Sequence, residues 1–164
     1  MAEQIVNFFV ELFKNKIPEE LTIFIISLFP ILEIRGGMIA ARILEVDFLK
    51  AFLICYAGNM LPIPFILLFI RSIFQFLRRF KFMHKILDRL EAKGEKNKDK
   101  VLKYKAWGLL AFVAVPLPGT GGWTGALIAA LLDLRMKKAL PIIALGVFVA
   151  GLIMSLITYG IFHF

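Results

Sequence analysis

The sequence predicts an all-α integral membrane protein with an inverted-topology repeat, in which each half is a re-entrant helical hairpin followed by a spanning helix. Three observations carry this prediction. The composition is too apolar for a soluble domain, two long apolar runs are interrupted by helix-breaking or charged residues, and the chain matches itself after a shift of 88 residues. Amphipathic surface helices are expected beside the two halves.

Composition places the chain in the membrane. Hydrophobic residues make up 60% of its 164 residues and the mean hydropathy is +0.81, whereas soluble domains contain roughly 45–50% apolar residues. None of the long apolar runs shows the ~10-residue alternation of a membrane β-barrel. We therefore expect one helical membrane domain with about four spans or span-equivalents. The apolar runs are 21–41, 48–70, 106–134 and 139–164.

The N-terminal residues 1–17 are predicted to form an amphipathic surface helix, because polar side chains recur at a spacing of three and four residues. Residues 19–45 follow as the first hairpin. Pro30, Glu33, Arg35 and a Gly-Gly pair lie at its centre, and one charge at the bilayer centre costs roughly 2.5–3.5 kcal/mol. A continuous lipid-facing helix is therefore disfavoured. We expect two half-helices, at about 20–29 and 37–44, joined by a polar elbow.

Residues 47–77 are predicted to form one tilted spanning helix, kinked near Pro62 and Pro64. The next segment, 78–105, contains eleven Lys or Arg against four acids and carries a net charge of +7. We interpret it as a basic surface helix to Leu90 and a solvated linker at 91–100, on the cytoplasmic side by the positive-inside rule. Its expected partner is anionic lipid rather than nucleic acid.

The second half repeats this plan, with a hairpin at 106–135 and a span at 138–164. Two prolines and three glycines fall between Pro116 and Gly122, and neither residue type supports a helix. Non-helical backbone at membrane depth needs partners from protein or from a water-filled cavity. The interrupted stretch is therefore a candidate site as well as a turn.

A shift of 88 residues aligns the two halves without gaps. Basic residues on both sides of the second hairpin favour a cytoplasmic opening for it. The last span then leaves the C-terminus outside, and the first hairpin opens to the outside. Inverted repeats of this kind are common in secondary transporters, whose sites lie at the repeat interface. The matched pairs are Pro30/Pro118, Gly37/Gly125, Ala41/Ala129, Glu45/Asp133, Lys50/Lys138, Ala51/Ala139 and Gly58/Gly146.

Charged and polar groups at depth supply the candidate site. Desolvation raises the pKa of a carboxyl group, so Glu33 is the expected proton-coupling residue, although a structural Glu33–Arg35 ion pair is an open alternative. The planar fork of Arg35 suits phosphate or carboxylate. Elbow amides could bind an anion at the start of the half-helix from Trp123. The residues expected to bind substrate are Arg35, Gly36, Asn59, Gly119, Thr120, Gly121, Gly122, Trp123 and Thr124.

Three motifs carry a family resemblance that covers about residues 20–160. PILEIRGGMIAA at 30–41, GNMLPIPF at 58–65 and PLPGTGGWTGALIAALL at 116–132 resemble the small multidrug export family of prokaryotic membrane proteins, a relative of the DedA-type (VTT-domain) superfamily. The resemblance implies export, and some DedA-type relatives are implicated in proton-driven flipping of undecaprenyl phosphate. Those relatives place acids in one hairpin and arginine in the other, whereas here both charges lie in the first.

The leading hypothesis is thus a transporter or flippase in the cytoplasmic membrane of a prokaryote, proton-coupled and moving an amphipathic or lipid-linked anion. A lipid scramblase or membrane-assembly protein is the alternative. An enzyme acting on lipid phosphates is disfavoured, because only Thr120 and Thr124 offer a nucleophile at the elbow, and no metal ligands cluster in the sequence. No cofactor is expected. A homodimer is expected because the helical bundle is thin.

Overall fold

The computed structural model describes residues 2–14, 16–77, 98–117, 119–132 and 134–160, and the regular elements within them are all helical. The all-α prediction is therefore confirmed. The first half contains α1 (Ala2–Phe13), α2 (Glu19–Leu28), α3 (Glu33–Ile43), α4 (Phe48–Met60) and α5 (Pro62–Leu77). The second half contains α7 (Lys98–Ala114), α8 (Gly122–Leu131) and α9 (Met136–Ser155), which ends in the π-helical turn η1 (Leu156–Gly160).

The first hairpin consists of α2, a four-residue elbow and α3, which packs along α2. Its second helix begins at Glu33, four residues before the expected start near Gly37. The two glycines do not break the helix, because they serve close packing instead. A Cβ on Gly36 would lie 2.6 Å from the Cβ of Leu32, and one on Gly37 would collide with the hydroxyl of Ser27 on α2.

The second hairpin consists of α7, the elbow 115–121 and α8. Helix α8 begins at Gly122, one residue before the expected start. Helix α7 begins at Lys98, so the last three residues of the expected linker 91–100 are helical. The expected surface helix at 78–90 and the rest of that linker lie outside the described residues.

Two helical segments are long and apolar enough to cross a membrane, namely Phe48–Phe69 and Met136–Gly160. The first contains the expected kink, because α4 and α5 are separated only by Leu61, directly before Pro62. Large apolar side chains on both segments face outward, such as Leu53 with 58% of its surface exposed. Such an exposed apolar surface suits lipid rather than water.

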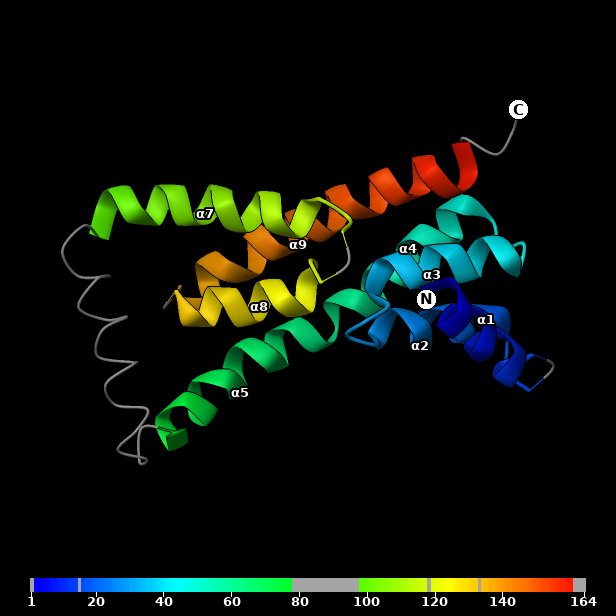
Figure 1. The fold of residues 1–164 in the computed structure, drawn as a ribbon, viewed down its shortest axis with the longest axis horizontal. Helices are drawn as coiled ribbons and strands as arrows, with labels where there is room; N and C mark the ends of the chain where they lie inside the picture. The colour runs from blue at the N-terminus through cyan, green and yellow to red at the C-terminus, as the bar shows by residue number, and fades with distance from the viewer. Residues whose placement is uncertain (1, 15, 78–97, 118, 133, 161–164) are drawn as a thin grey trace.

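Each long helix begins beside its own hairpin and ends against the other one. Helix α5 packs on α8, while α9 and η1 pack on α3. Figure 1 shows this exchange, with α5 running beneath α8 and the end of α9 reaching the α3–α4 region. Helices α4 and α9 also contact each other, and there the hydroxyl of Tyr56 donates to the carbonyl of Ala144 over 3.2 Å. These two residues are 88 positions apart.

The turn that ends α3 recurs 88 residues later at the end of α8. The Val46 amide donates to the Ala41 carbonyl over 2.9 Å, and the Leu134 amide donates to the Ala129 carbonyl over the same distance. Both turns lead directly into a long helix, α4 in the first case and α9 in the second. The same local structure therefore connects each hairpin to its long helix.

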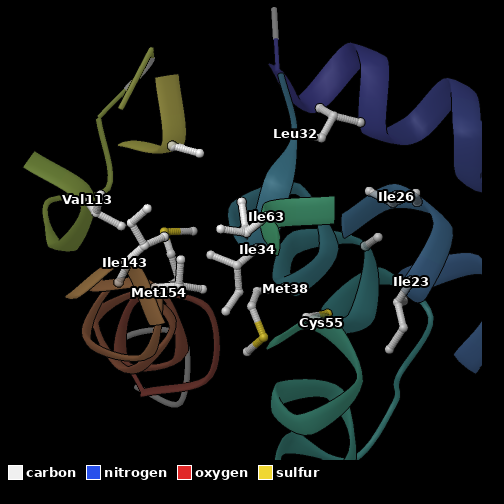
Figure 2. Close-up of a cluster of buried hydrophobic side chains, with 14 of the residues drawn as sticks. Ile23, Ile26, Leu32, Ile34, Met38, Cys55, Ile63, Val113, Ile143 and Met154 are labelled. Atoms are coloured by element: carbon white, nitrogen blue, oxygen red, sulfur yellow. The ribbon is translucent and has the colours of Figure 1, made fainter. Parts of the chain in front are cut away.

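One continuous core joins the two halves. Figure 2 shows Ile34 and Ile63 at its centre, with Val113 and Ile143 to one side and Cys55 to the other. All five side chains are at most 2% exposed. Because the core crosses between the halves, the elbows of the two hairpins are held against each other.

Helix α1 covers the first hairpin, where it packs on α2 and α3. Its inner face buries Val6 and Val10, and the ring of Phe9 lies 4.9 Å from that of Phe29 in the elbow. Phe8, by contrast, is 62% exposed. One face of this amphipathic helix therefore packs against the protein. Another face carries the exposed apolar side chain of Phe8.

Candidate functional site: the junction of two hairpin elbows

The carboxylate of Glu33 binds the N-terminus of α8. One of its oxygens accepts a hydrogen bond from the Gly122 amide over 2.9 Å, and the other accepts one from the Trp123 amide over 3.2 Å. The first amides of a helix have no partner within the helix, and they lie at the positive end of its dipole. The anion at this helix terminus is therefore Glu33 itself, which is only 1% exposed.

The backbone at both sides of this contact is unusual. Glu33 has a φ of +50°, which is uncommon for a residue with a side chain. Gly121 has a φ of +135°, and a Cβ at this position would collide with the Glu33 carboxylate. Glycine is required at 121 for both conformation and close approach. Backbone strain of this kind is concentrated at functional sites.

Arg35 makes the reciprocal contact, from the first hairpin to the carbonyl groups of the second elbow. Its half-buried guanidinium donates to the carbonyls of Leu117 and Thr120, the latter over 2.6 Å. The Thr120 hydroxyl stabilises the same elbow, because it accepts from the Leu117 amide over 3.1 Å and lies 2.7 Å from the carbonyl of Val115. Arg35 therefore donates hydrogen bonds to elbow carbonyl groups that have no partner within a helix.

The Glu33–Arg35 ion pair that the sequence left open is not formed. Instead, the carboxylate binds amides and the guanidinium binds carbonyls, all of them on the second hairpin. The first hairpin supplies both charges, and the second supplies only backbone groups. The two charges together fasten one elbow to the other.

Asn59 on α4 completes the junction. Its side chain is fully buried, and neither its amide nitrogen nor its oxygen has a hydrogen-bond partner. An unpaired buried amide is costly, so such a group calls for an explanation. Asn59 lines a cavity of about 10 Å³ together with Glu33, Arg35 and Gly122, and a Cβ on Gly122 would lie 3.4 Å from its oxygen. That volume is near the minimum for one water molecule, so the junction is closed to larger ligands.

The remaining expected site residues are less central. Gly36, Gly119 and Thr124 do not line the cavity. Gly119 has a φ of +84° and open space around its Cα. Trp123 contributes its backbone amide to Glu33, while its half-buried indole leaves a buried nitrogen without a partner.

The sequence did not reveal that Glu33 and the α8 amides are partners. The 88-residue shift offered a signal, because it sets Glu33 opposite Gly121, the glycine against which the carboxylate packs. Val147 and Ala150 of α9, which also line the cavity, were not among the predicted site residues. Both belong to an ordinary apolar run in the sequence.

A second feature lies on the outside of the protein. An open apolar groove of about 700 Å³ runs along the kink between α4 and α5 and along the start of α9. Met60 lines this groove, and its neighbour Asn59 lines the internal cavity. The groove residues are Ala57, Met60, Leu61, Pro64, Phe65, Leu140, Pro141 and Ala144.

Neither the cavity nor the groove contains a metal-binding cluster. Within the described part of the chain, no group of three His, Cys, Asp or Glu side chains lies close enough together to hold a metal ion. The chemistry available at the junction is therefore one carboxylate, one guanidinium, one amide and the backbone groups of a helix terminus. Groups of these kinds can bind ions and exchange protons.

Comparison with known proteins assigns the family. Residues 33–153, about three quarters of the chain, match the family model described as "Putative small multi-drug export protein". No curated protein and no solved structure matches the chain. The matched region begins at Glu33 and contains both elbow contacts described above. Together with the two apolar helical segments, this match identifies a membrane protein, and the chain belongs to the small multi-drug export protein family.

Proposed function

We propose that this protein is a proton-coupled membrane transporter or flippase that moves an anionic amphipathic substrate through the junction of its two elbows. The observation that carries the proposal is the reciprocal fastening of the elbows, with the Glu33 carboxylate on the Gly122 and Trp123 amides and Arg35 on the Thr120 carbonyl. These contacts lie where the two halves meet, and a carboxylate in this position could exchange a proton. In secondary transporters that position is where substrate and coupling ions bind.

The architecture that supports this mechanism is an inverted-topology repeat of two re-entrant hairpins. In its favour, equivalent turns follow both hairpins, and the Tyr56–Ala144 contact joins positions 88 residues apart. Each long helix also packs on the hairpin of the other half. An exchange of this kind is what a two-fold axis in the membrane plane would produce.

The described conformation corresponds to a closed state in the proposed cycle, because its internal cavity of about 10 Å³ admits no substrate. Protonation of Glu33 would remove the negative charge that binds the α8 terminus. The elbows could then separate on one side of the membrane, exposing Arg35 and Asn59. In this proposed mechanism, the apolar part of the substrate moves along the groove beside Met60.

The topology is part of the proposal. We place the protein in the cytoplasmic membrane of a prokaryote, with the basic segment 78–105 on the cytoplasmic side against anionic lipids and the C-terminus outside. Cysteines introduced at Glu45 and Asp133, after replacement of Cys55, would test the arrangement by labelling with a membrane-impermeant reagent. Labelling from opposite sides is expected, and labelling from one side would rule out the inverted repeat.

Transport itself is tested in proteoliposomes with a fluorescent phosphatidic acid as probe, by following its movement between leaflets under an imposed pH gradient. Glu33→Gln should abolish the dependence on the gradient, and Arg35→Ala should slow probe movement at least about tenfold. Glu20→Gln, at an exposed carboxylate away from the junction, is the matched control. Unchanged gradient-driven movement in both junction variants would refute the mechanism.

A lipid scramblase is the second candidate, favoured by the open apolar groove. A scramblase would move lipid without a gradient and without need for Glu33. In the same assay, gradient-independent movement that survives Glu33→Gln but is lost when Ala57 on the groove wall becomes Trp would favour this function.

A further inference from the structure

We propose that Glu33 occupies a binding site for oxyanions, and that a phosphate-type group from outside the protein binds there in its place. The inference rests on the proposed function and deepens it, because it names the chemistry that the junction recognises. In the described conformation the site is filled by a side chain of the protein's own first hairpin. The residues that form it are Gly122, Trp123 and Asn59, with Arg35 beside them.

The donors already point at an anion. The amides of Gly122 and Trp123 hold a carboxylate at 2.9 and 3.2 Å, in a setting that binds phosphate and sulfate in many proteins. A helix terminus alone would be weak evidence. Here it adjoins Asn59, whose side chain is fully buried, lines the same cavity and has both polar atoms unpaired.

The unpaired amide of Asn59 distinguishes a ligand site from a structural cap. The Glu33 carboxylate satisfies the helix terminus, and it interacts with the nearby Asn59 side chain without forming a hydrogen bond of normal geometry. A tetrahedral oxyanion is larger than a carboxylate and carries more acceptor oxygens, so it could accept from both helix amides and from Asn59 together. The protein would thus carry a donor that the larger anion binds more closely than the carboxylate does.

Arg35 supplies the charge for such a ligand. Among the residues that line the cavity, Glu33 and Arg35 are the charged ones; α4, α7, α8 and α9 contribute neutral side chains or backbone. When Glu33 leaves, the guanidinium remains beside an unoccupied helix terminus. Arginine is well suited to bind phosphate there because of its planar donor geometry.

The cavity is so small that an oxyanion must replace the Glu33 side chain and cannot bind beside it. A cavity of about 10 Å³ has room for about one water molecule, so an oxyanion cannot enter while the Glu33 side chain stays in place. The two anions therefore compete for the same amides. Protonation of Glu33 weakens the internal competitor, and by linkage the external oxyanion favours the protonated form of Glu33. Proton and oxyanion should consequently bind together.

Sulfate binding to the purified full-length protein tests this competition, because the charge of sulfate is constant between about pH 5.5 and about pH 8. The Trp107→Phe background leaves Trp123 as the single tryptophan, next to the site, for a fluorescence titration. Sulfate should bind the Glu33-containing protein more tightly at the lower pH. Glu33→Gln should bind it about tenfold more tightly at the higher pH, within the usual range of coupling, and with little dependence on pH.

Two further variants provide an independent test of the site and a control. Asn59→Leu, which has a similar volume, should weaken sulfate binding several-fold at the lower pH even if Glu33→Gln folds poorly. Glu20→Gln should leave the pH dependence unchanged. Displacement of sulfate by phosphatidic acid in mixed micelles, but not by glycerol phosphate, would assign a lipid headgroup; equal displacement by both would assign a free phosphate ester.

The proposal is overturned if sulfate affinity is independent of pH in the Glu33-containing protein, or if Asn59→Leu binds sulfate unchanged. It is also overturned if Glu33→Gln gains no affinity. These outcomes are separate from those of the transport assay. Sulfate competition without any transport would remove the proposed function and leave the oxyanion site intact, whereas transport without competition would do the reverse.

Discussion

The two hairpins have the same plan, yet they contribute opposite kinds of chemistry to their junction. In the first, the elbow is four residues long and is followed at once by Glu33 and Arg35 on α3. In the second, the elbow 115–121 is longer and contributes carbonyls, and the start of α8 after it contributes amides. The first hairpin provides charged side chains, and the second provides backbone groups that form hydrogen bonds with them.

This difference explains why a glycine faces a glutamate across the junction. If both elbows carried a carboxylate, two buried like charges would meet, which is costly. If both were glycine-rich, the carbonyls and amides exposed by the broken helices would have no partners. Unlike residues at positions 33 and 121, which the 88-residue shift pairs, avoid both costs. The difference in chemistry between the two elbows is therefore what allows them to pack against each other.

The largest expected effect comes from removing the glycine of the second elbow. Gly121→Ala introduces a Cβ that collides with the Glu33 carboxylate, at a φ of +135° that disfavours any side chain. We expect loss of the elbow contact and a destabilisation of several kcal/mol, since strain adds about 1–3 kcal/mol to the lost hydrogen bonds. Thermal unfolding in detergent measures it. Gly108→Ala, where nothing lies within 4 Å of the new Cβ, should be neutral or slightly stabilising; equal effects would contradict the contact.

The charged contribution of the first hairpin is tested by replacing the guanidinium of Arg35 with an ammonium group. Arg35→Lys keeps the charge but cannot reproduce two parallel donations to the Leu117 and Thr120 carbonyls. We expect a loss of about 1.5–3 kcal/mol in unfolding free energy, as for one hydrogen bond to a charged group. Arg42→Lys is a suitable control, because Arg42 lies near the end of the same helix and its guanidinium is 5.8 Å from the Tyr159 ring. A smaller loss at Arg35 than at Arg42 would argue against the fastening role.

The exchange of long helices between the halves is tested by two hydroxyl deletions. Tyr56→Phe removes the donation to Ala144, and Tyr159→Phe removes the donation to Val46 over 2.9 Å. Each should cost about 1 kcal/mol, the usual net value of one hydrogen bond. Because the sites are separate, the double variant should show the sum of the two effects. A strongly non-additive result would show that the two crossings are coupled through α9.

The smallest effect is expected at the periphery, where Lys50 and Glu20 form an exposed ion pair at 2.5 Å. The ammonium of Lys50 holds the pKa of Glu20 below its usual range, chiefly through their hydrogen bond. The stabilisation is therefore present above the usual carboxyl range and is lost as the pH falls through the lowered value. Glu20→Gln should change the melting temperature only marginally at neutral pH, and not at all in acid or high salt. A large change would mean that this pair, which joins α2 to α4 within the first half, contributes more to stability than an exposed ion pair should.

Much of the local structure could be predicted from the sequence, since it depends on neighbouring residues. Pro30 and the Pro116–Gly122 stretch end helices wherever they occur, so both elbows were foreseeable. The kink before Pro62 and the two long apolar helices follow from the same rules. Gly36 and Gly37 were misjudged, because a glycine pair predicts a break, whereas here both glycines lie inside α3 and allow it to approach Leu32 and Ser27.

The sequence by itself determined the membrane environment, the family, the positions of the elbows and the identity of the two charges at their junction. Only the tertiary structure decided what those charges bind. The partners of Glu33 and Arg35 are backbone groups 82 to 90 residues away, and a backbone amide or carbonyl leaves no mark in the sequence. A backbone amide or carbonyl is free to bind a side chain only where a helix ends. Which helix ends meet which side chains is decided by how the two distant hairpins pack together.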